Sequence, residues 1–227
     1  MIGIGGTSMS GIAEILNQWG FNVTGSDANS SAVTDKLIED GIKVTIGHSH
    51  YDVDEADLVV YSAAIKPDDP ELKRAKDLGI ETALRADFIG EITKAYRNTI
   101  SIAGTHGKTT TSSMAAHLLH QSHVDCNAFL GGITKNYRTN YILSSSSPYV
   151  VIEADEFDRS FLQLFPEIAV ITSMDADHLD IYGDEAHIRE AFKAFASQVS
   201  GTVIAKYGLD ITPNDTKAMI MTYSFGD

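Results

Sequence analysis

The chain of 227 residues contains one cysteine, Cys126, so an internal disulfide is excluded and a reducing compartment is favoured. Because Cys126 sits beside apolar residues, we expect a small buried thiol rather than a nucleophile. No run is long and apolar enough to span a bilayer, and no leader pattern opens the chain. The sequence therefore predicts no membrane insertion and a cytoplasmic location.

Positive charge is also scarce. Lysine and arginine number 17 against 31 aspartates and glutamates, and the resulting formal net charge of −14 argues against nucleic acid as a partner. A phosphorylated ligand is not excluded, because glycine loops, one lysine and magnesium can hold phosphate locally. The length suits one large or two modest domains of ordinary globular composition.

Short apolar runs alternate with segments of helical periodicity, a pattern that predicts an α/β fold with parallel sheet. We expect a first domain over residues 1–97 and a second over residues 98–227. The predicted strands lie at residues 2–4, 21–24, 42–46, 58–61, 99–103, 149–152, 168–172 and 202–205. The predicted helices lie at residues 9–19, 33–40, 71–78, 88–96, 109–121 and 185–199. Candidate ligand-binding residues fall beyond the carboxyl ends of these strands, where open parallel sheets bind ligands.

The most informative segment is a glycine-bounded turn that follows the run Ile100-Ser101-Ile102-Ala103 and ends in Gly107-Lys108-Thr109. Backbone N–H groups in such a turn, together with the next helix N-terminus, bind phosphate oxygens. Lys108 is expected to reach the outer phosphates, and the Thr109 hydroxyl to ligate magnesium. The common form has a glycine where this chain has Ile102, so the turn is a shortened relative that begins at Gly104. The alternative is a plain strand–helix turn; the setting favours a nucleoside triphosphate site.

Two acidic clusters follow predicted strands. Glu153 is the first residue after residues 149–152, and one such carboxylate together with Thr109 suffices to hold magnesium against a triphosphate. Asp158, further along, is interpreted as solvated. The second cluster runs from Asp175 to Asp180 and contains His178, which is a second metal ligand, an orienting group or a surface residue.

The chain opens on a second glycine turn, Gly3-Ile4-Gly5-Gly6, which matches the dinucleotide fingerprint only in part because Ser8 stands where the third glycine belongs. Asp27 follows the next predicted strand and is placed to accept hydrogen bonds from ribose hydroxyls. The turn is compatible with NAD, FAD or a nucleotide-sugar, or with a tight turn that only needs small residues. Because Met1 leads directly into it, we expect a clipped first strand.

As a set, these motifs resemble the Mur ligase family. The matching segments keep the family's order and begin at Gly3, Gly25, Tyr61, Arg85, Gly104, Phe129, Glu153 and Asp177. Residues 173–175 depart from the family by reading Ser-Met-Asp where Asn-Ile-Glu is common. The family's third-domain signature, Asp-Asp-Tyr-Ala-His-His-Pro, is absent. We therefore expect a fragment that is truncated in its central domain, lacks the C-terminal amino-acid-binding domain and is inactive by itself.

The resemblance implies a Rossmann-like UDP-sugar domain followed by a P-loop-type ATPase domain. It implies a ligase that uses ATP and two Mg²⁺ ions to join L-alanine to the lactyl carboxylate of UDP-N-acetylmuramate through an acyl phosphate, in peptidoglycan precursor synthesis. The implied catalytic residues are Lys108, Glu153 and His178, and the implied metal ligands are Thr109, Glu153 and His178. The implied ATP-binding residues are Gly104, Thr105, His106, Gly107, Lys108, Thr109 and Thr110. The implied UDP-sugar-binding residues are Gly5, Gly6, Met9, Ser10, Asp27, Ser62, Ala63, Ala64, Arg85 and His106.

Other functions stay open. A related ligase that attaches a recycled tripeptide to the same sugar would share both domains, although the continuation Asp158-Arg159-Ser160-Phe161-Leu162 looks more like the alanine enzyme. A non-catalytic nucleotide-binding module also describes the isolated fragment. A dehydrogenase that uses the first glycine turn would leave the second phosphate loop without a role.

Overall fold

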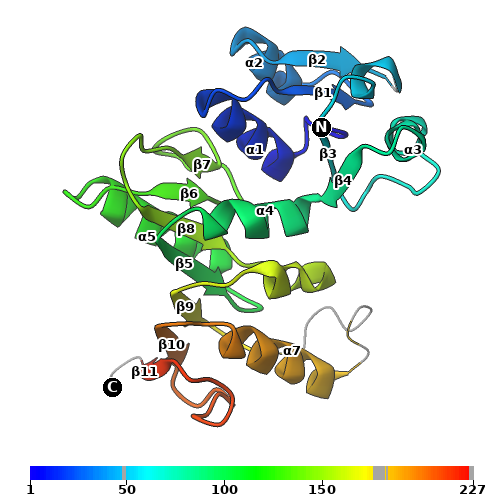
Figure 1. Ribbon diagram of the computed structural model, residues 1–227. Helices are drawn as coiled ribbons and strands as arrows, with labels where there is room; N and C mark the ends of the chain where they lie inside the picture. The colour runs from blue at the N-terminus through cyan, green and yellow to red at the C-terminus, as the bar shows by residue number, and fades with distance from the viewer. Residues whose placement is uncertain (48–49, 176–181, 183, 225–227) are drawn as a thin grey trace. The chain divides into compact units, whose positions relative to one another are not determined.

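A computed structural model describes residues 1–47, 50–175, 182 and 184–224 of the chain. The chain divides into two compact units, Met1–Ile89 and Gly90–Asp227, each built around parallel strands and helices (Figure 1). The mixed α/β architecture predicted from the sequence is confirmed. In the ranges described, no helix combines the length and the apolar character needed to cross a membrane.

The N-terminal segment is the centre of the first sheet. Ile2 forms parallel bridges to Ser26 on one side and to Tyr61 on the other, so the predicted strand over residues 2–4 is reduced to these bridges. The pairs β1–β2 and β3–β4 are parallel. With the N-terminal segment counted as the first strand, the sheet has the strand order of a Rossmann fold. The strands are β1 (Thr24–Asp27), β2 (Lys43–Ile46), β3 (Leu58–Tyr61) and β4 (Glu81–Leu84).

The strand β1 lies three residues later than predicted. The apolar side chain of Phe21 is exposed, and the paired residues are the small and polar Thr24–Asp27. Small residues are required because a Cβ atom on Gly25 would lie 2.6 Å from Cδ1 of Ile4. The close packing of the N-terminal segment on β1 therefore overrides the weak strand propensity of these residues.

The helices of the first unit begin at local capping signals. Ser31 and Thr34 form a capping box at the start of α2, and Asp69 accepts the N–H groups of Glu71 and Leu72 at the start of α3. The apolar faces of these helices pack on the sheet in two buried clusters. The elements of this unit are α1 (Thr7–Gln18), α2 (Ala32–Glu39), η1 (His50–Val53) and α3 (Pro70–Asp77). Helix α4 (Arg85–Lys94) contains the division between the units, since Ile89 belongs to the first unit and Gly90 to the second.

The second unit contains a sheet with the strand order β11-β10-β9-β5-β8-β6-β7, parallel except for β7. The strand β5, which leads into the phosphate loop, is central and is flanked by β8 and β9 (Figure 1). The sequence did not predict β6, β7 and β11 here or β4 in the first unit. The strands are β5 (Asn98–Ala103), β6 (Asn127–Phe129), β7 (Tyr141–Ile142), β8 (Tyr149–Glu153), β9 (Ile168–Ile171), β10 (Thr202–Lys206) and β11 (Met219–Tyr223).

Helix α5 (Lys108–His120) packs on β5, β6 and β8, and a buried cluster that includes Ile102, Ala116 and Cys126 fills the space between them. Cys126 is buried, as the sequence predicted, and burial raises the pKa of its thiol to about 12. A second cluster joins the 3-10 segment η2 (Phe157–Gln163) to α7 (Glu185–Ser197), where the Phe161 ring stacks on Phe195 with centroids 5.1 Å apart.

Candidate nucleotide-phosphate and sugar sites

The strand–turn–helix setting predicted for the phosphate loop is present. The turn leaves β5 at Ala103, and α5 begins at Lys108 with Gly107 as its N-cap. Gly104 and Gly107 both have positive φ values, 135° and 83°. A Cβ atom on Gly104 would lie 2.1 Å from Oγ1 of Thr172, so only glycine fits there. Because Gly107 has no side chain to cap the helix, the first N–H groups of α5 remain available to an anion.

Residues that follow β9 hold the loop in this shape. The Ser173 hydroxyl accepts the N–H of His106 at 2.8 Å and lies 2.9 Å from the Thr105 hydroxyl. The Thr172 hydroxyl donates to the His106 carbonyl at 2.6 Å, and the Asp175 N–H donates to the Thr105 hydroxyl at 3.1 Å. The departure of residues 173–175 from the family pattern therefore falls on the residues that brace the loop. The departure is visible in the sequence, whereas the contact with the loop is not.

Lys108 is paired with a buried carboxylate. Its Nζ atom lies 2.9 Å from Oε1 and 2.8 Å from Oε2 of Glu156, and 3.8 Å from Oδ1 of Asp155. The Glu156 side chain is 1 % exposed and that of Lys108 13 %, and the Tyr182 hydroxyl donates to the Glu156 carbonyl at 2.6 Å. An ammonium group has three donors, so this pair leaves Lys108 able to donate to a phosphate as well. Sequence reasoning missed Glu156, whose only signal was its place in an acidic cluster after a strand.

The predicted metal ligands Thr109 and Glu153 lie together. The Thr109 hydroxyl donates to Oε1 of Glu153 at 2.9 Å, while the Gly131 N–H and the Ser112 hydroxyl donate to Oε2 at 2.9 and 3.3 Å. These partners are all neutral, so none of them compensates the negative charge of Glu153. The hydroxyl and carboxylate oxygens are hard donors that suit Mg²⁺, which takes one or two carboxylates and completes its shell with phosphate and water.

Within the described ranges, no group of three His, Cys, Asp or Glu side chains is arranged to hold a metal ion by itself. A magnesium ion on Thr109 and Glu153 would therefore depend on ligand oxygens. His178, the predicted ligand of a second ion, lies in residues 176–181, outside the described residues. Asp175, at the edge of that segment, has its Oδ2 atom 3.7 Å from Nε2 of His106, and both side chains are exposed.

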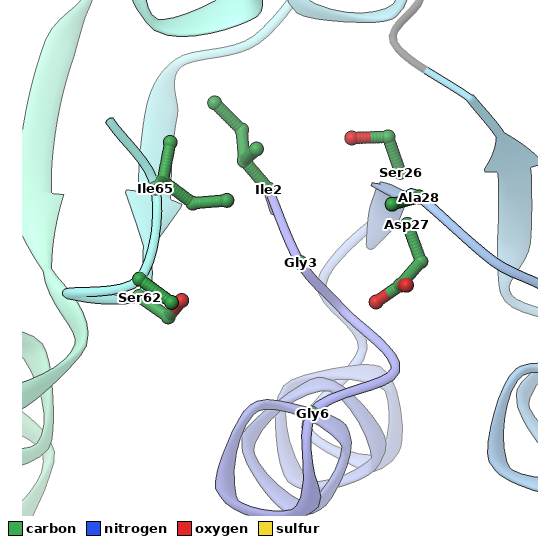
Figure 2. A pocket seen from close by; sticks show the side chains of 9 residues that line it. Ile2, Gly3, Gly6, Ser26, Asp27, Ala28, Ser62 and Ile65 are labelled. Atoms are coloured by element: carbon green, nitrogen blue, oxygen red, sulfur yellow. The ribbon is translucent and has the colours of Figure 1, made fainter. Parts of the chain in front are cut away.

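The first unit has a cavity of about 230 Å³ at the carboxyl ends of β1 and β3, where the strand order reverses on either side of the N-terminal segment. Figure 2 shows Ser62 and Ile65 on one side of this segment, and Ser26 and Asp27 on the other. The N–H of Gly5 donates to Oδ2 of Asp27 at 2.9 Å, so the glycine turn and this carboxylate are joined directly.

Four of the predicted sugar-binding residues line the cavity, namely Gly6, Asp27, Ser62 and Ala64. Ala63 and Arg85 are not among the lining residues; Met9 and Ser10 are buried in α1, and His106 belongs to the second unit. Sequence reasoning missed the other lining residues, Ile2, Gly3, Ser26, Ala28 and Ile65. Ser26 and Ala28 could have been predicted as lining residues because they are the sequence neighbours of Asp27.

The first unit has the strand order of a Rossmann fold and a cavity at the point where that order reverses. The second unit has a phosphate loop, a lysine and a hydroxyl–carboxylate pair. Together these features define a nucleotide-binding α/β protein. Family models narrow this class: the Mur ligase family catalytic domain matches residues 1–97, and the Mur ligase middle domain matches residues 102–226. The chain belongs to the Mur ligase family.

Curated relatives and solved structures agree with this assignment. The chain is 47 % identical over 235 residues to UDP-N-acetylmuramate–L-alanine ligase of Porphyromonas gingivalis, an alignment that covers 100 % of the chain and 51 % of the relative. It is 48 % identical over 206 residues to the enzyme of that name from Acetivibrio thermocellus, covering 90 % and 44 %. The chain thus spans about half the length of the curated relatives it matches.

Two solved structures cover the whole chain at 28 % identity. One is the UDP-N-acetylmuramate:L-alanyl-gamma-D-glutamyl-meso-diaminopimelate ligase from Neisseria meningitides, with a TM-score of 0.88 and 79 % of that chain covered. The other is the UDP-N-acetylmuramate-alanine ligase from Thermotoga maritima, with a TM-score of 0.85 and 52 % covered.

Proposed function

We propose that this chain is the nucleotide-handling part of an ATP-dependent ligase that joins L-alanine to the lactyl carboxylate of UDP-N-acetylmuramate. Residues 1–97 bind the UDP-sugar at the cavity beside Asp27, and residues 98–227 bind ATP at the Gly104–Thr109 turn. The observation that carries the proposal is the convergence of Lys108, Thr109 and Glu153 on this turn, at the carboxyl ends of β5 and β8.

The reaction needs two anions, a carboxylate and a triphosphate, to approach each other. A lactyl carboxylate oxygen attacks the γ-phosphorus, the bond to ADP breaks, and an acyl phosphate forms. The amine of L-alanine then attacks the acyl carbon, loses a proton and expels inorganic phosphate, leaving an amide. Most of the acceleration comes from alignment and charge neutralisation, because phosphoryl transfer needs little covalent work from the protein.

The residues divide this work. The N–H groups at the start of α5 and the Lys108 ammonium bind the β- and γ-phosphates and offset their charge. Thr109 and Glu153 hold Mg²⁺, which supplies further positive charge to the phosphate oxygens when bound. His178 is proposed as a ligand of a second ion. In the first unit, Asp27 and the adjoining glycine turn orient the UDP-sugar.

L-Alanine is favoured over a tripeptide as the acceptor by sequence identity. The curated alanine ligases are 45–48 % identical to this chain. The two solved structures, one named as a tripeptide ligase and the other as an alanine ligase, are both 28 % identical to it, so they do not distinguish the two acceptors.

The test is an ADP-release assay on the full-length protein that carries this chain, with UDP-N-acetylmuramate, Mg-ATP and either L-alanine or the tripeptide. We expect release that requires the sugar and L-alanine, and its loss in Lys108→Ala while UDP-sugar binding by calorimetry survives. Turnover with the tripeptide alone would establish the other ligase. Binding of both nucleotides without any turnover would indicate a non-catalytic module, and turnover by Lys108→Ala would refute the role of Lys108.

A further inference from the structure

The glycine turn that follows β6 contacts Glu153, the proposed magnesium ligand. The Gly131 N–H donates to Oε2 of Glu153 at 2.9 Å. The same carboxylate accepts the Thr109 hydroxyl on its other oxygen, Oε1. One oxygen is thus fixed by a backbone amide, and the other is turned toward the hydroxyl with which it would share a metal ion.

The turn also leaves no room for a side chain at this position. A Cβ atom on Gly131 would lie 2.4 Å from Oε1, 2.6 Å from Oε2 and 2.6 Å from Cδ of Glu153. These distances are far below van der Waals contact, and all three atoms belong to the end of a flexible side chain. A methyl group at residue 131 would therefore displace the carboxylate while leaving the fold intact. Gly132 differs, because its nearest atom would be Cγ2 of Thr109 at 3.2 Å.

We propose that Gly131 is a positioning residue for the metal site: its amide orients the Glu153 carboxylate, and its missing side chain keeps one oxygen directed at Thr109. The inference rests on the proposed function, since it assigns Gly131 to the magnesium site of that ATP-binding turn. Groups that orient a metal ligand typically change metal affinity by about 10–100-fold when they are altered.

The test measures how strongly Mg²⁺ enhances ADP binding to the full-length protein. Calorimetry gives the ADP dissociation constant with and without Mg²⁺, and the ratio isolates the metal contribution from phosphate binding by the loop. We expect Gly131→Ala to lower this ratio about tenfold or more and to leave metal-free ADP binding unchanged. Gly132→Ala is the matched control and should reduce the ratio far less. Thermal unfolding without ligand verifies that both variants fold.

A second variant keeps the inference testable if Gly131→Ala folds poorly. Glu153→Asp withdraws the carboxylate by one methylene from both Thr109 and Gly131, so it should lower the ratio as well. In the double variant, the shorter side chain leaves space for the new methyl group, and the two losses should be less than additive.

The outcomes separate the two proposals. If the unmodified protein binds ADP with no magnesium dependence, the proposed magnesium site on Thr109 and Glu153 is refuted, and the role of Gly131 with it. If the unmodified protein shows that dependence and Gly131→Ala retains it in full, only the role of Gly131 is overturned. An equal loss of ADP affinity with and without Mg²⁺ would also overturn it, because it would show general damage to the loop.

Discussion

Removal of the Lys108 ammonium should destabilise the second unit even when no nucleotide is present. Glu156 is 1 % exposed, and both of its carboxylate oxygens lie within 2.9 Å of the Lys108 Nζ atom. The Lys108→Met variant keeps the apolar stem and removes the charge, which leaves Glu156 buried opposite a methyl group. Asp155, 3.8 Å from the same nitrogen, carries the wrong charge to compensate. Leaving one partner of a buried ion pair without the other costs about 3–5 kcal/mol.

The reverse change should cost less. In Glu156→Gln, Lys108 keeps an amide oxygen beside it and Asp155 at its present distance. The free energy of unfolding should therefore fall by about the contribution of one charged hydrogen bond, about 1.5–3 kcal/mol. Combining the two substitutions also removes the buried negative charge that Lys108 neutralises. The double variant Lys108→Met with Glu156→Gln should therefore be more stable than Lys108→Met alone, a reversal that independent sites would not show.

The chain provides a probe for each unit. Cys126 is the single cysteine and is fully buried in the second unit, and Trp19 is the single tryptophan and lies in the first. Pulse labelling of the thiol along a urea gradient gives the unfolding midpoint of the second unit, and tryptophan fluorescence in the same samples follows the first. For a typical urea slope, the expected loss lowers the thiol midpoint by about 1–3 M.

Lys94→Met is the matched control. Lys94 belongs to the same unit and pairs with Glu91 at 2.6 Å, but the two side chains are 48 % and 68 % exposed. An exposed pair of this kind contributes about 1 kcal/mol or less. If Lys108→Met unfolds at the same urea concentration as Lys94→Met, or if Glu156→Gln does not restore stability to Lys108→Met, the buried pair does not have the role argued from its burial and distances.

Two further predictions concern the brace of the phosphate loop and the buried thiol. Ser173→Ala leaves the His106 N–H without its acceptor at 2.8 Å, a loss of about 1–3 kcal/mol, and we expect about tenfold weaker ADP binding by calorimetry. Ser197→Ala on α7 is the control, and unchanged affinity in Ser173→Ala would contradict the brace. Burial raises the Cys126 pKa from 9.0 to about 12, so between these pH values the folded chain keeps a thiol proton that the unfolded chain loses. The stability that the buried neutral thiol contributes is therefore complete below pH 9 and disappears as the pH rises toward 12. Urea unfolding followed by circular dichroism at rising alkaline pH should show a shallower decline for Cys126→Ala, and identical slopes would disprove the assignment.

Hydrophobic periodicity predicts the helices and strands that bury one continuous apolar face. The helix α5 and the strands β3, β5 and β8 lie within a residue or so of the expected positions because their buried faces are continuous. The strand β1 does not, since Thr24–Asp27 is paired only because the N-terminal segment lies against it. The strands β6 and β7 have three and two residues, too few for a period to be read, and β11 is largely exposed.

The same distinction applies to the site. The rule that ligands bind beyond the carboxyl ends of parallel strands was enough to bring Thr109 and Glu153 into one prediction. It says which residues gather at an edge and nothing about which side chains face one another there. The pairing of Lys108 with Glu156 depends on the path of the chain after β8, where Tyr182 hydrogen-bonds the Glu156 carbonyl. No local pattern encodes that path.

Strand order explains why two glutamates only three residues apart have different environments. The strand β8 lies between β5, which leads into the phosphate loop, and β6, which leads into the Gly131 turn. Glu153 ends β8, so it lies between the Thr109 hydroxyl and the Gly131 amide, and both of these donors are neutral. Glu156 comes after the chain has left the sheet, and it neutralises Lys108. A sheet in which β6 did not neighbour β8 would leave Glu153 without the Gly131 amide, so the parallel pairing of two short strands places this amide against the carboxylate that we propose as the metal ligand.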